Sequence, residues 1–450
     1  MTTTTNAVPA ELLVDFDVYD PRLAAPEDVF QQRVLELAAV SPVVYSPAYG
    51  GHWIVTRYTE VAEVLRDPAR FSSYPNNLVP HGFGKFIPLE YDPPAHTAFR
   101  HALQPLFNPH RMNALEPQIR AIVTELIDGF AARGSAEFIT EFAHELPARV
   151  FLALMGWPLQ DAPMFTEATD TTLHGIPGAS EEESTAARAE AAGRMMNYFA
   201  AVVADRRTGS ADTSDVTASI INSDIEIDGE LRRLTNEELC NIFMLLLIAG
   251  LHTTQGSLAW GIMHLAAHAD QRAALVEDPS LIPSAVEEVL RVEAAVSPGR
   301  RVVHDTELGG VRLRGGDQML VMLTGANRDP REFDKPDDMH VIRTPNRHLS
   351  FGTGPHRCLG SHLARVVLRI ALEELLRRLP DIEPDPDQPS VSNTAQVRGV
   401  LKLLPASPLK RRQGNRAVLS NSIPISARAC VSVQRHAVWR VISRTFAATY

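Results

Sequence analysis

The residues best suited to chemistry form one short segment near the carboxyl end of the chain. Residues 351–360 read Phe-Gly-Thr-Gly-Pro-His-Arg-Cys-Leu-Gly, and Cys358 comes just before a predicted helix over residues 359–379. Free backbone N–H groups and the dipole at a helix start lower the pKa of a thiol, and glycines let the backbone turn tightly beside the sulfur. The segment is therefore suited to hold a thiolate, the form of cysteine that ligates metals.

The cysteine count narrows the kind of metal centre. Cys240, Cys358 and Cys430 lie far apart and form no Cys-x-x-Cys pair, so a zinc or iron–sulfur site made of this chain's thiolates is not expected. So few thiols also predict no disulfide framework and a reducing compartment. The alternative to a ligand role for Cys358 is a lone buried cysteine in a glycine-rich turn.

The segment resembles the cysteine-ligand loop of the cytochromes P450, in the spelling usual for bacterial members. The resemblance implies a haem b cofactor with Cys358 as the axial ligand to its iron. A thiolate in that position pushes electron density onto bound oxygen and favours O–O cleavage. Phe351 is expected to pack on the thiolate side and keep water away, while Gly352, His356 and Gly360 are expected to contact the cofactor.

Two further motifs fall in the order that the family requires. Residues 92–100 are similar to the helix that supplies charged donors to the buried haem propionates. By this resemblance, His96 and Arg100 share the task with Arg300, or its neighbour Arg301, and with His348.

The second of these motifs is Glu288-Val289-Leu290-Arg291, which looks like the family's Glu-x-x-Arg pair. Its i, i+3 spacing places both side chains on one side of a helix. In the family this pair is locked to the irregular segment before the cysteine loop, here about residues 327–347. Such a pair on its own is more often a solvated surface ion pair.

Residues 249–254 resemble the oxygen-binding stretch of the family. Ala249 and Gly250 would leave room for dioxygen, and Thr253 would hold a water for proton delivery. The alternative is that Ala-Gly makes a helix-packing contact and that Thr253 bonds its own backbone. The family usually has Asp or Glu before this threonine, whereas this chain has His252. Histidine can also shuttle protons near neutral pH, so both a different proton route and a peroxide-driven enzyme are open.

The substrate is expected to be a small or medium hydrophobic molecule, with a terpenoid or an aromatic compound as the guess. Residues 86–88 resemble the camphor-hydroxylase group, but Gly84 stands where that enzyme has its substrate-binding tyrosine, so camphor is not indicated. Matching positions place five apolar residues on the pocket wall: Leu245, Ile248, Ala249, Ala295 and Val296.

The resemblance implies O2 as co-substrate and electrons from a separate ferredoxin and its NAD(P)H-dependent reductase. Arg100, Arg111 and Arg357 could meet an acidic partner of this kind. Hydroxylation by a monooxygenase is the leading interpretation. The alternatives of other classes are a haem- or ligand-binding protein without catalysis and a helical protein without haem.

Most of the chain is predicted to be helical, which gives a mainly α cytochrome P450 fold with small β-sheets and the haem between the central helix and the Cys-loop helix. Thr235 and Glu238 form a capping box at the start of the longest predicted helix, which is apolar nearly all round over residues 242–251 and is therefore expected at the centre. Helices are predicted over residues 24–38, 60–65, 96–106, 117–132, 181–206, 235–267, 283–293 and 359–379, with strands at 52–56, within 301–323 and through 397–404.

Length and charge complete the expectations. The 450-residue chain has a net charge of −11 and no basic stripe, which argues against nucleic-acid binding. It shows no signal peptide, and its longest apolar run is too short for a membrane span, so a cytoplasmic monomer is expected. The predicted organisation is an N-terminal extension over residues 1–23, a cytochrome P450 domain over 24–406, and a basic, poorly ordered extension over 407–450. A basic anchor for an acidic partner or a membrane surface is the alternative for the last segment.

Overall fold

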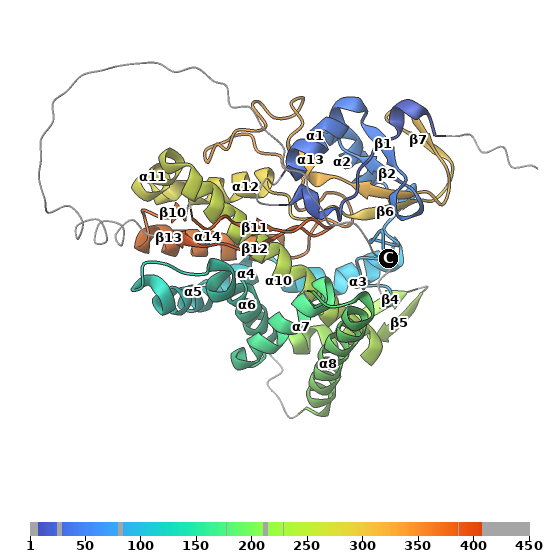
Figure 1. Cartoon of the computed structure of the whole chain (residues 1–450). Coiled ribbons are helices and arrows are strands. Elements are labelled where there is room, and N and C mark those ends of the chain that lie inside the picture. Colours follow the sequence, from blue (N-terminus) through green and yellow to red (C-terminus); the bar gives the residue numbers. More distant parts are fainter. Residues whose placement is uncertain are drawn as a thin grey trace, which may run out of the picture. The chain divides into compact units, whose positions relative to one another are not determined.

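The structure is a computed structural model that describes residues 8–24, 29–79, 84–176, 178–209, 215–227, 229–385 and 387–406. The chain divides into two units, residues 1–408 and 409–450. The fold described below is that of the first unit (Figure 1). The predicted basic extension, residues 407–450, lies outside the described residues.

Helices make up most of the described chain, as predicted for a mainly α fold. The α-helices are α1 (Phe30–Val40), α2 (Tyr58–Arg66), α3 (Ala95–Leu103), α4 (Pro109–Ala114), α5 (Glu116–Ala131), α6 (Glu145–Met155), α7 (Ala162–His174), α8 (Glu181–Thr208), α9 (Val216–Ile221), α10 (Asn236–Ala267), α11 (Ala269–Glu277), α12 (Ile282–Val292), α13 (Leu323–Asn327) and α14 (Ser361–Arg378).

The central helix is α10, and its start is fixed by the predicted capping box. The Thr235 hydroxyl accepts from the Glu238 N–H at 3.1 Å, and the Glu238 carboxylate accepts from the Thr235 N–H at 2.8 Å. Helices α6, α8, α12 and α14 pack against α10, which Figure 1 shows in the middle of the helical part. Most apolar side chains of this helix are therefore covered by other helices, whereas Leu245 and Ile248 are half-buried and Ala249 is exposed.

By length and composition, α10 could also cross a membrane, and it is the one such helix among the described residues. Its most apolar 18-residue window has a mean hydropathy of 1.5, yet 72% of that window is buried inside the protein. A core helix passes the same test as a membrane span, and the burial identifies α10 as a core helix.

The main sheet has the strand order β1-β2-β9-β6-β3, in which β2 and β9 pair in parallel and the other neighbours are antiparallel. Trp53 and Val55 of β2 pack with α2 and α13, whereas Ile54 between them packs with α1. Both faces are thus covered, which explains the run of apolar residues in this strand. The strands are β1 (Val43–Ser46), β2 (His52–Val55), β3 (Phe71–Ser72), β4 (Asp224–Ile227), β5 (Glu230–Arg233), β6 (Gly299–Val302), β7 (Thr306–Leu308), β8 (Val311–Leu313), β9 (Gln318–Val321), β10 (Glu383–Pro384), β11 (Val391–Ser392), β12 (Val400–Lys402) and β13 (Pro405–Ala406).

Several boundaries differ from those predicted. Phe16 and Val18 are buried with α1 against the main sheet, so residues 8–24 belong to the packed unit and are not an extension. The helix predicted over residues 24–38 begins only at Phe30. The helix predicted over 96–106 ends at Leu103 and continues as a 3-10 turn, because Pro105 has no N–H for an α-helical bond. Helices α4, α6, α7, α9, α11 and α13 were not predicted.

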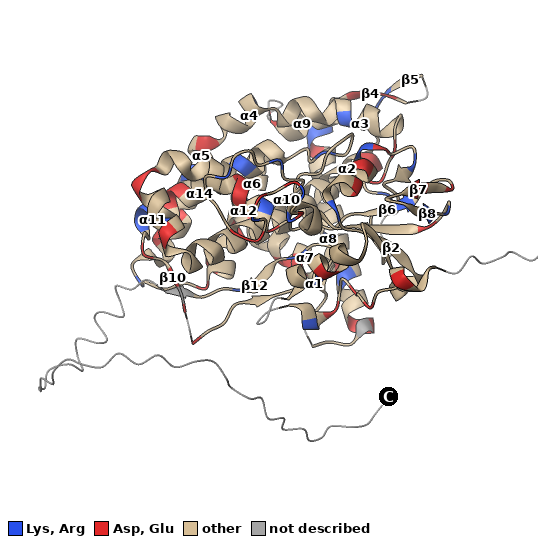
Figure 2. Cartoon of the chain, turned by 90° about the horizontal axis from the view of Figure 1, so that it is seen from above, with Lys and Arg blue, Asp and Glu red and all other residues tan. Residues whose placement is uncertain are grey.

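Figure 2 shows Lys and Arg as well as Asp and Glu scattered along the ribbon, with no continuous basic stripe in this view.

Candidate active site

The loop that carries Cys358 is held by its own backbone. The Cys358 N–H donates to the Phe351 carbonyl at 2.8 Å, and the Gly352 N–H donates to the Leu349 carbonyl at 2.7 Å. Gly354 has a φ of 73°, and a Cβ atom there would lie 2.5 Å from the Leu65 carbonyl oxygen. Only glycine satisfies both the backbone conformation and this close approach. The loop therefore sets Cys358 at a fixed place just before α14.

The surroundings of the Cys358 sulfur combine burial with positive charge. Burial raises the pKa of the Cys358 thiol, whereas the N–H of Gly360 and the guanidinium of Arg100 lower it. The side chain of Cys358 is nevertheless exposed. Protein atoms therefore lie around Cys358, but the side chain keeps an accessible side. A ligand to a metal needs such an accessible side.

Four cationic or imidazole side chains from three distant segments converge near this loop. His96 and Arg100 lie one turn apart on α3, Arg300 is on β6, and His356 lies in the cysteine loop. The ring centroids of His96 and His356 are 4.1 Å apart. The charge of Arg300 also acts on His356 and helps to depress its pKa. The structure therefore brings together three of the four predicted propionate donors, His96, Arg100 and Arg300, and adds His356, which was predicted only to contact the cofactor.

The two histidines of this cluster are buried without hydrogen-bond acceptors. Both ring nitrogens of His96 and the Nε2 of His356 have no hydrogen-bond partner among the described residues, and the nearest Asp92 oxygen is 4.0 Å from that Nε2. Burial lowers the pKa of His96 to about 4 and that of His356 to about 2. Arg300 is only 4% exposed, and burial lowers its pKa to about 10. Such a cluster costs free energy unless an anion accepts from it, and two haem propionates fit this donor set.

His348, the fourth predicted donor, does not join them. Its Nε2 lies 3.1 Å from the Glu287 carboxylate, and its Nδ1 accepts from the Ser350 N–H at 3.2 Å. Both ring nitrogens are therefore engaged, which corrects the expectation that His348 binds a propionate. Glu287 also accepts from Arg365 at 2.6 and 2.8 Å, and that guanidinium lies over the Phe351 ring at 4.5 Å. His348 thus supports the cysteine loop through Glu287 and Arg365, which contacts Phe351.

Glu288 and Arg291 form a fully buried ion pair at the end of α12. Two hydrogen bonds of 2.8 Å join the guanidinium to the carboxylate. Arg291 also donates to the carbonyls of Asn327, Pro336 and Asp338 at 2.7–3.0 Å. The pair therefore fixes the irregular segment that leads to the cysteine loop, and it is not a solvated surface pair.

The oxygen-binding stretch lies in the middle of α10. Ala249 and Gly250 are exposed although Leu247 and Leu251 beside them are buried, so they do not make a helix-packing contact. The Thr253 hydroxyl donates to the Ala249 carbonyl at 2.7 Å, as the backbone-bonding alternative predicts. This bond leaves the lone pairs of the hydroxyl oxygen free to accept from another donor.

The predicted wall residues are all incompletely covered by protein. Leu245 and Ile248 of α10 are half-buried, as are Ala295 and Val296 after α12. Val296 pairs with Val397 in an isolated bridge, and the Ala295 carbonyl accepts from the Arg398 N–H at 2.8 Å. Backbone contacts therefore hold these two residues in place while their side chains keep exposed apolar surface.

His252 has a partner that the sequence did not suggest. Its Nε2 lies 2.9 Å from the Asp170 carboxylate, which comes from α7 and stands 82 residues away in sequence. Burial raises the pKa of Asp170, but the hydrogen bond from His252 and the nearby imidazoles of His144 and His174 together outweigh it and hold that pKa below the usual value. The buried Nδ1 of His252 has no partner among the described residues. Helix α7 therefore supplies a carboxylate next to His252, the residue before Thr253.

Comparison with known proteins agrees with this geometry. The family model described as "Cytochrome P450" matches residues 160–408. Mycinamicin IV hydroxylase/epoxidase of Micromonospora griseorubida is 36% identical over 366 residues, covering 78% of this chain and 88% of that protein. Vitamin D(3) 25-hydroxylase of Pseudonocardia autotrophica is 34% identical over 342 residues, covering 74% and 82%.

Solved structures show the same fold. CYP101J2 superimposes with a TM-score of 0.79 and 31% sequence identity, covering 91% of this chain and 100% of that one. HmtN, a hydroxylase involved in himastatin biosynthesis, has a TM-score of 0.72 and 31% identity over 82% and 94% of the two chains. The family model matches more than half of the chain, and the alignment with mycinamicin IV hydroxylase/epoxidase covers 88% of that protein. The chain therefore belongs to the cytochrome P450 family of haem-thiolate monooxygenases.

Proposed function

We propose that this monooxygenase inserts one atom of O2 into a small or medium hydrophobic substrate, with haem b bound through Cys358. The cluster of His96, Arg100, Arg300 and His356 carries the proposal, because the unpaired ring nitrogens of the two histidines and the buried charge of Arg300 require an anionic group at this place. When bound, the haem supplies the activation of O2 and the oxidising power for C–H hydroxylation. The protein's own residues hold the propionates, keep water off the sulfur and deliver protons.

Proton delivery is assigned to Thr253 and His252. The Thr253 hydroxyl is anchored to the Ala249 carbonyl and can accept a hydrogen bond from a water on the haem side. His252 has one nitrogen on Asp170 and a second nitrogen without a partner among the described residues. A histidine that exchanges a proton between two nitrogens can pass it from a carboxylate toward a water. Asp170 therefore takes the place of the carboxylate expected on α10.

The substrate class follows from the wall residues. Leu245, Ile248, Ala249, Ala295 and Val296 are apolar and keep exposed surface, so they favour a hydrophobic ligand. Two relatives are named for action on mycinamicin IV and vitamin D(3), so substrates in this group of relatives are chemically diverse. A terpenoid or an aromatic ring compound remains our proposal for this chain.

We propose that a separate ferredoxin and its NAD(P)H-dependent reductase supply the electrons. The enzyme is proposed to be a cytoplasmic monomer. Arg111 and Arg357 are exposed, and Arg100 donates to the Arg357 carbonyl at 2.6 Å. These three arginines lie on or close to the cysteine loop and α4. They offer a positive surface for an acidic electron donor.

A peroxide-driven enzyme is the second candidate, because His252 replaces the acid usual in the family. The two candidates are separated by turnover of a panel of terpenoid and aromatic substrates. Product formed with NAD(P)H, a ferredoxin and its reductase supports the monooxygenase. Product formed with hydrogen peroxide alone, and none with any electron donor, supports the alternative.

The cofactor site is tested by the absorbance difference spectrum of the reduced, carbon monoxide-bound protein. We expect a strongly red-shifted Soret band for the native chain and its loss in Cys358→Ser, because an alcohol does not replace a thiolate as an electron-rich ligand. A red-shifted band that persists in the variant would contradict the assignment of Cys358. Retained haem in the variant shows that the propionate cradle has still formed.

A further inference from the structure

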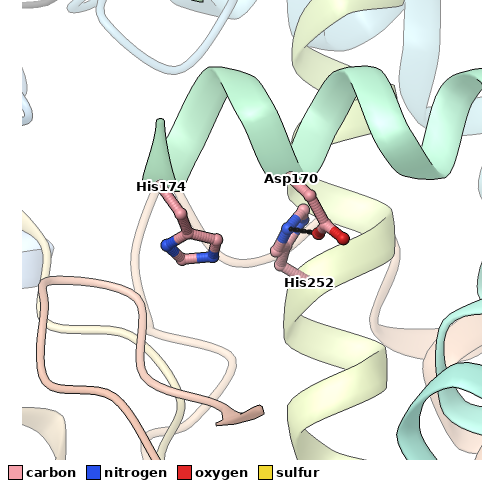
Figure 3. A group of neighbouring side chains, drawn as sticks. All are labelled: Asp170, His174 and His252. Atoms are coloured by element: carbon pink, nitrogen blue, oxygen red, sulfur yellow. Dashed lines mark hydrogen bonds and ion pairs between the residues drawn. The ribbon is translucent and has the colours of Figure 1, made fainter. Parts of the chain in front are cut away.

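Three potential metal ligands meet where α7 crosses α10. Asp170 and His174 are four residues apart on α7 and therefore share one face of that helix. His252 approaches them from α10, and Figure 3 shows all three side chains on the side where the two helices meet. One ligand atom from each lies within 4.8 Å of the other two. The Asp170 oxygen and the His252 Nε2 are 2.9 Å apart.

We infer that Asp170, His174 and His252 form a binding site for a divalent transition-metal ion of the zinc class. Two imidazoles and one carboxylate are a donor set that Zn²⁺ binds in proteins. With metal–ligand bonds of about 2.0–2.2 Å, neighbouring ligand atoms lie about 3.0–3.5 Å apart. The distance between Asp170 and His252 already fits this value closely.

The remaining ligand must move by more than an ångström. Because neighbouring ligand atoms lie about 3.0–3.5 Å apart on one ion, a separation of up to 4.8 Å has to shorten by about 1.3–1.8 Å. His174 lies at the C-terminal end of α7 and is exposed, so rotation of its side chain can supply this movement. Asp170 and His252 can remain where they are.

A third histidine lies next to this cluster. The Nδ1 of His144 lies 3.7 Å from the second Asp170 oxygen, so three imidazoles lie around one carboxylate. His144 is outside the group of possible ligands, but it is placed to orient Asp170.

An ion at this site would tie α7 to α10 one residue before Thr253. If His252 delivers protons as proposed above, bound Zn²⁺ would occupy it and slow turnover, and a chelator would restore the rate. This consequence rests on the proposed function. The binding itself does not, because it is measured without turnover.

The test is equilibrium dialysis of the full-length, haem-loaded protein against Zn²⁺, with metal content measured by mass spectrometry. We expect one Zn²⁺ per chain in the native protein and at least tenfold weaker binding in His174→Gln and Asp170→Asn. His304→Gln is the matched control, because His304 is also exposed but lies outside the cluster. Its binding should equal that of the native protein.

Two outcomes would overturn the inference. One is no stoichiometric Zn²⁺ uptake by the native protein. The other is equal uptake by native protein and His174→Gln, which would identify an adventitious ion at surface histidines only. Circular dichroism and the carbon monoxide spectrum verify that each variant is folded and carries haem. The exposed position of His174 makes its variant the safer of the two for folding.

Discussion

Substitution of Glu288 by Gln isolates the buried charge that holds the segment before the cysteine loop. The Glu288 carboxylate accepts two hydrogen bonds of 2.8 Å from Arg291 and two contacts of 3.1 Å from Arg343. It also accepts from the His340 N–H at 2.8 Å and from Asn346 at 3.1 Å. Glutamine keeps the shape, but it turns one oxygen into an NH2 group that faces donors and leaves the fully buried Arg291 without its counter-charge.

The expected cost follows from this burial. Removing one partner of a buried ion pair typically destabilises a protein by about 3–5 kcal/mol, because the other charge stays buried and unpaired. That is a large part of the total stability of a folded protein, about 5–15 kcal/mol, so Glu288→Gln should still fold but with a much smaller margin. Arg343 keeps carbonyl partners at Asp334, Lys335 and Asp338 and limits the loss.

The chain offers a matched control in Glu36→Gln. Arg33 and Glu36 form a pair with the same residue types and the same i, i+3 spacing, but both side chains are largely exposed, at 37% and 49%. Exposed pairs of this kind contribute little because water and salt screen them. Urea unfolding followed by circular dichroism should therefore show a clear loss of stability for Glu288→Gln and none for Glu36→Gln. Equal effects of the two substitutions would refute the reasoning.

The same variant has a signature in pH. Burial raises the pKa of Glu288, but Arg291 outweighs it, and the pKa lies below its usual value in the folded protein. A depressed carboxyl pKa contributes stability that is fully present above the unfolded pKa and is lost as the pH falls through the folded value. Native protein should thus lose stability with acidification below about pH 4.5 more steeply than Glu288→Gln does.

Three other substitutions test the site. Gly354→Ala should abolish most haem incorporation, because its Cβ would clash with the Leu65 carbonyl. Gly352→Ala should cost only about 1–2 kcal/mol of stability, since its φ is 63° but no atom lies within 4 Å of the added Cβ. Haem content per chain should therefore fall strongly in the first variant and little in the second. Arg300→Met should speed transfer of haem to apomyoglobin about tenfold to a hundredfold, as loss of charge-assisted bonds of about 1.5–3 kcal/mol predicts, and an unchanged transfer rate would remove Arg300 from the cradle. Thr253→Ala should lower product per NAD(P)H consumed about tenfold or more and raise peroxide release, while thermal stability stays unchanged because the Thr253 hydroxyl bonds only its own helix among the described residues.

Sequence reasoning succeeded where local chemistry decides the structure. The cysteine loop is defined by glycines and a helix start within ten residues, and the capping box of α10 is written in four residues. Glu288 and Arg291 lie on one helix turn, so their mutual contact needs no tertiary information. Each of these features depends on neighbours along the chain, which a single sequence contains.

The missed features depend on contacts between distant segments. His348 was placed with the propionate donors, but its partner Glu287 stands 61 residues away and no local pattern joins them. Helix α7 was missed because its second half is rich in threonine, which is a weak helix former. Thr169 and Thr172 satisfy their hydroxyls on carbonyls four residues earlier, and both are buried, so tertiary packing makes this segment helical. Asp170 and His174 went unnoticed with it.

The interaction between α7 and α10 changes the meaning of His252. Judged from the sequence, a histidine in place of an acid removes the usual carboxylate beside Thr253 and leaves a peroxide-driven enzyme open as an alternative. The structure places a carboxylate next to that histidine, because Asp170 lies 2.9 Å from His252. A proton carrier, His252 on α10, and a carboxylate, Asp170 on α7, are then both present. Because the proton passes between these two side chains, the route depends on the contact between α7 and α10. For this reason the monooxygenase is the better proposal, and the same contact is where a metal ion would act on it.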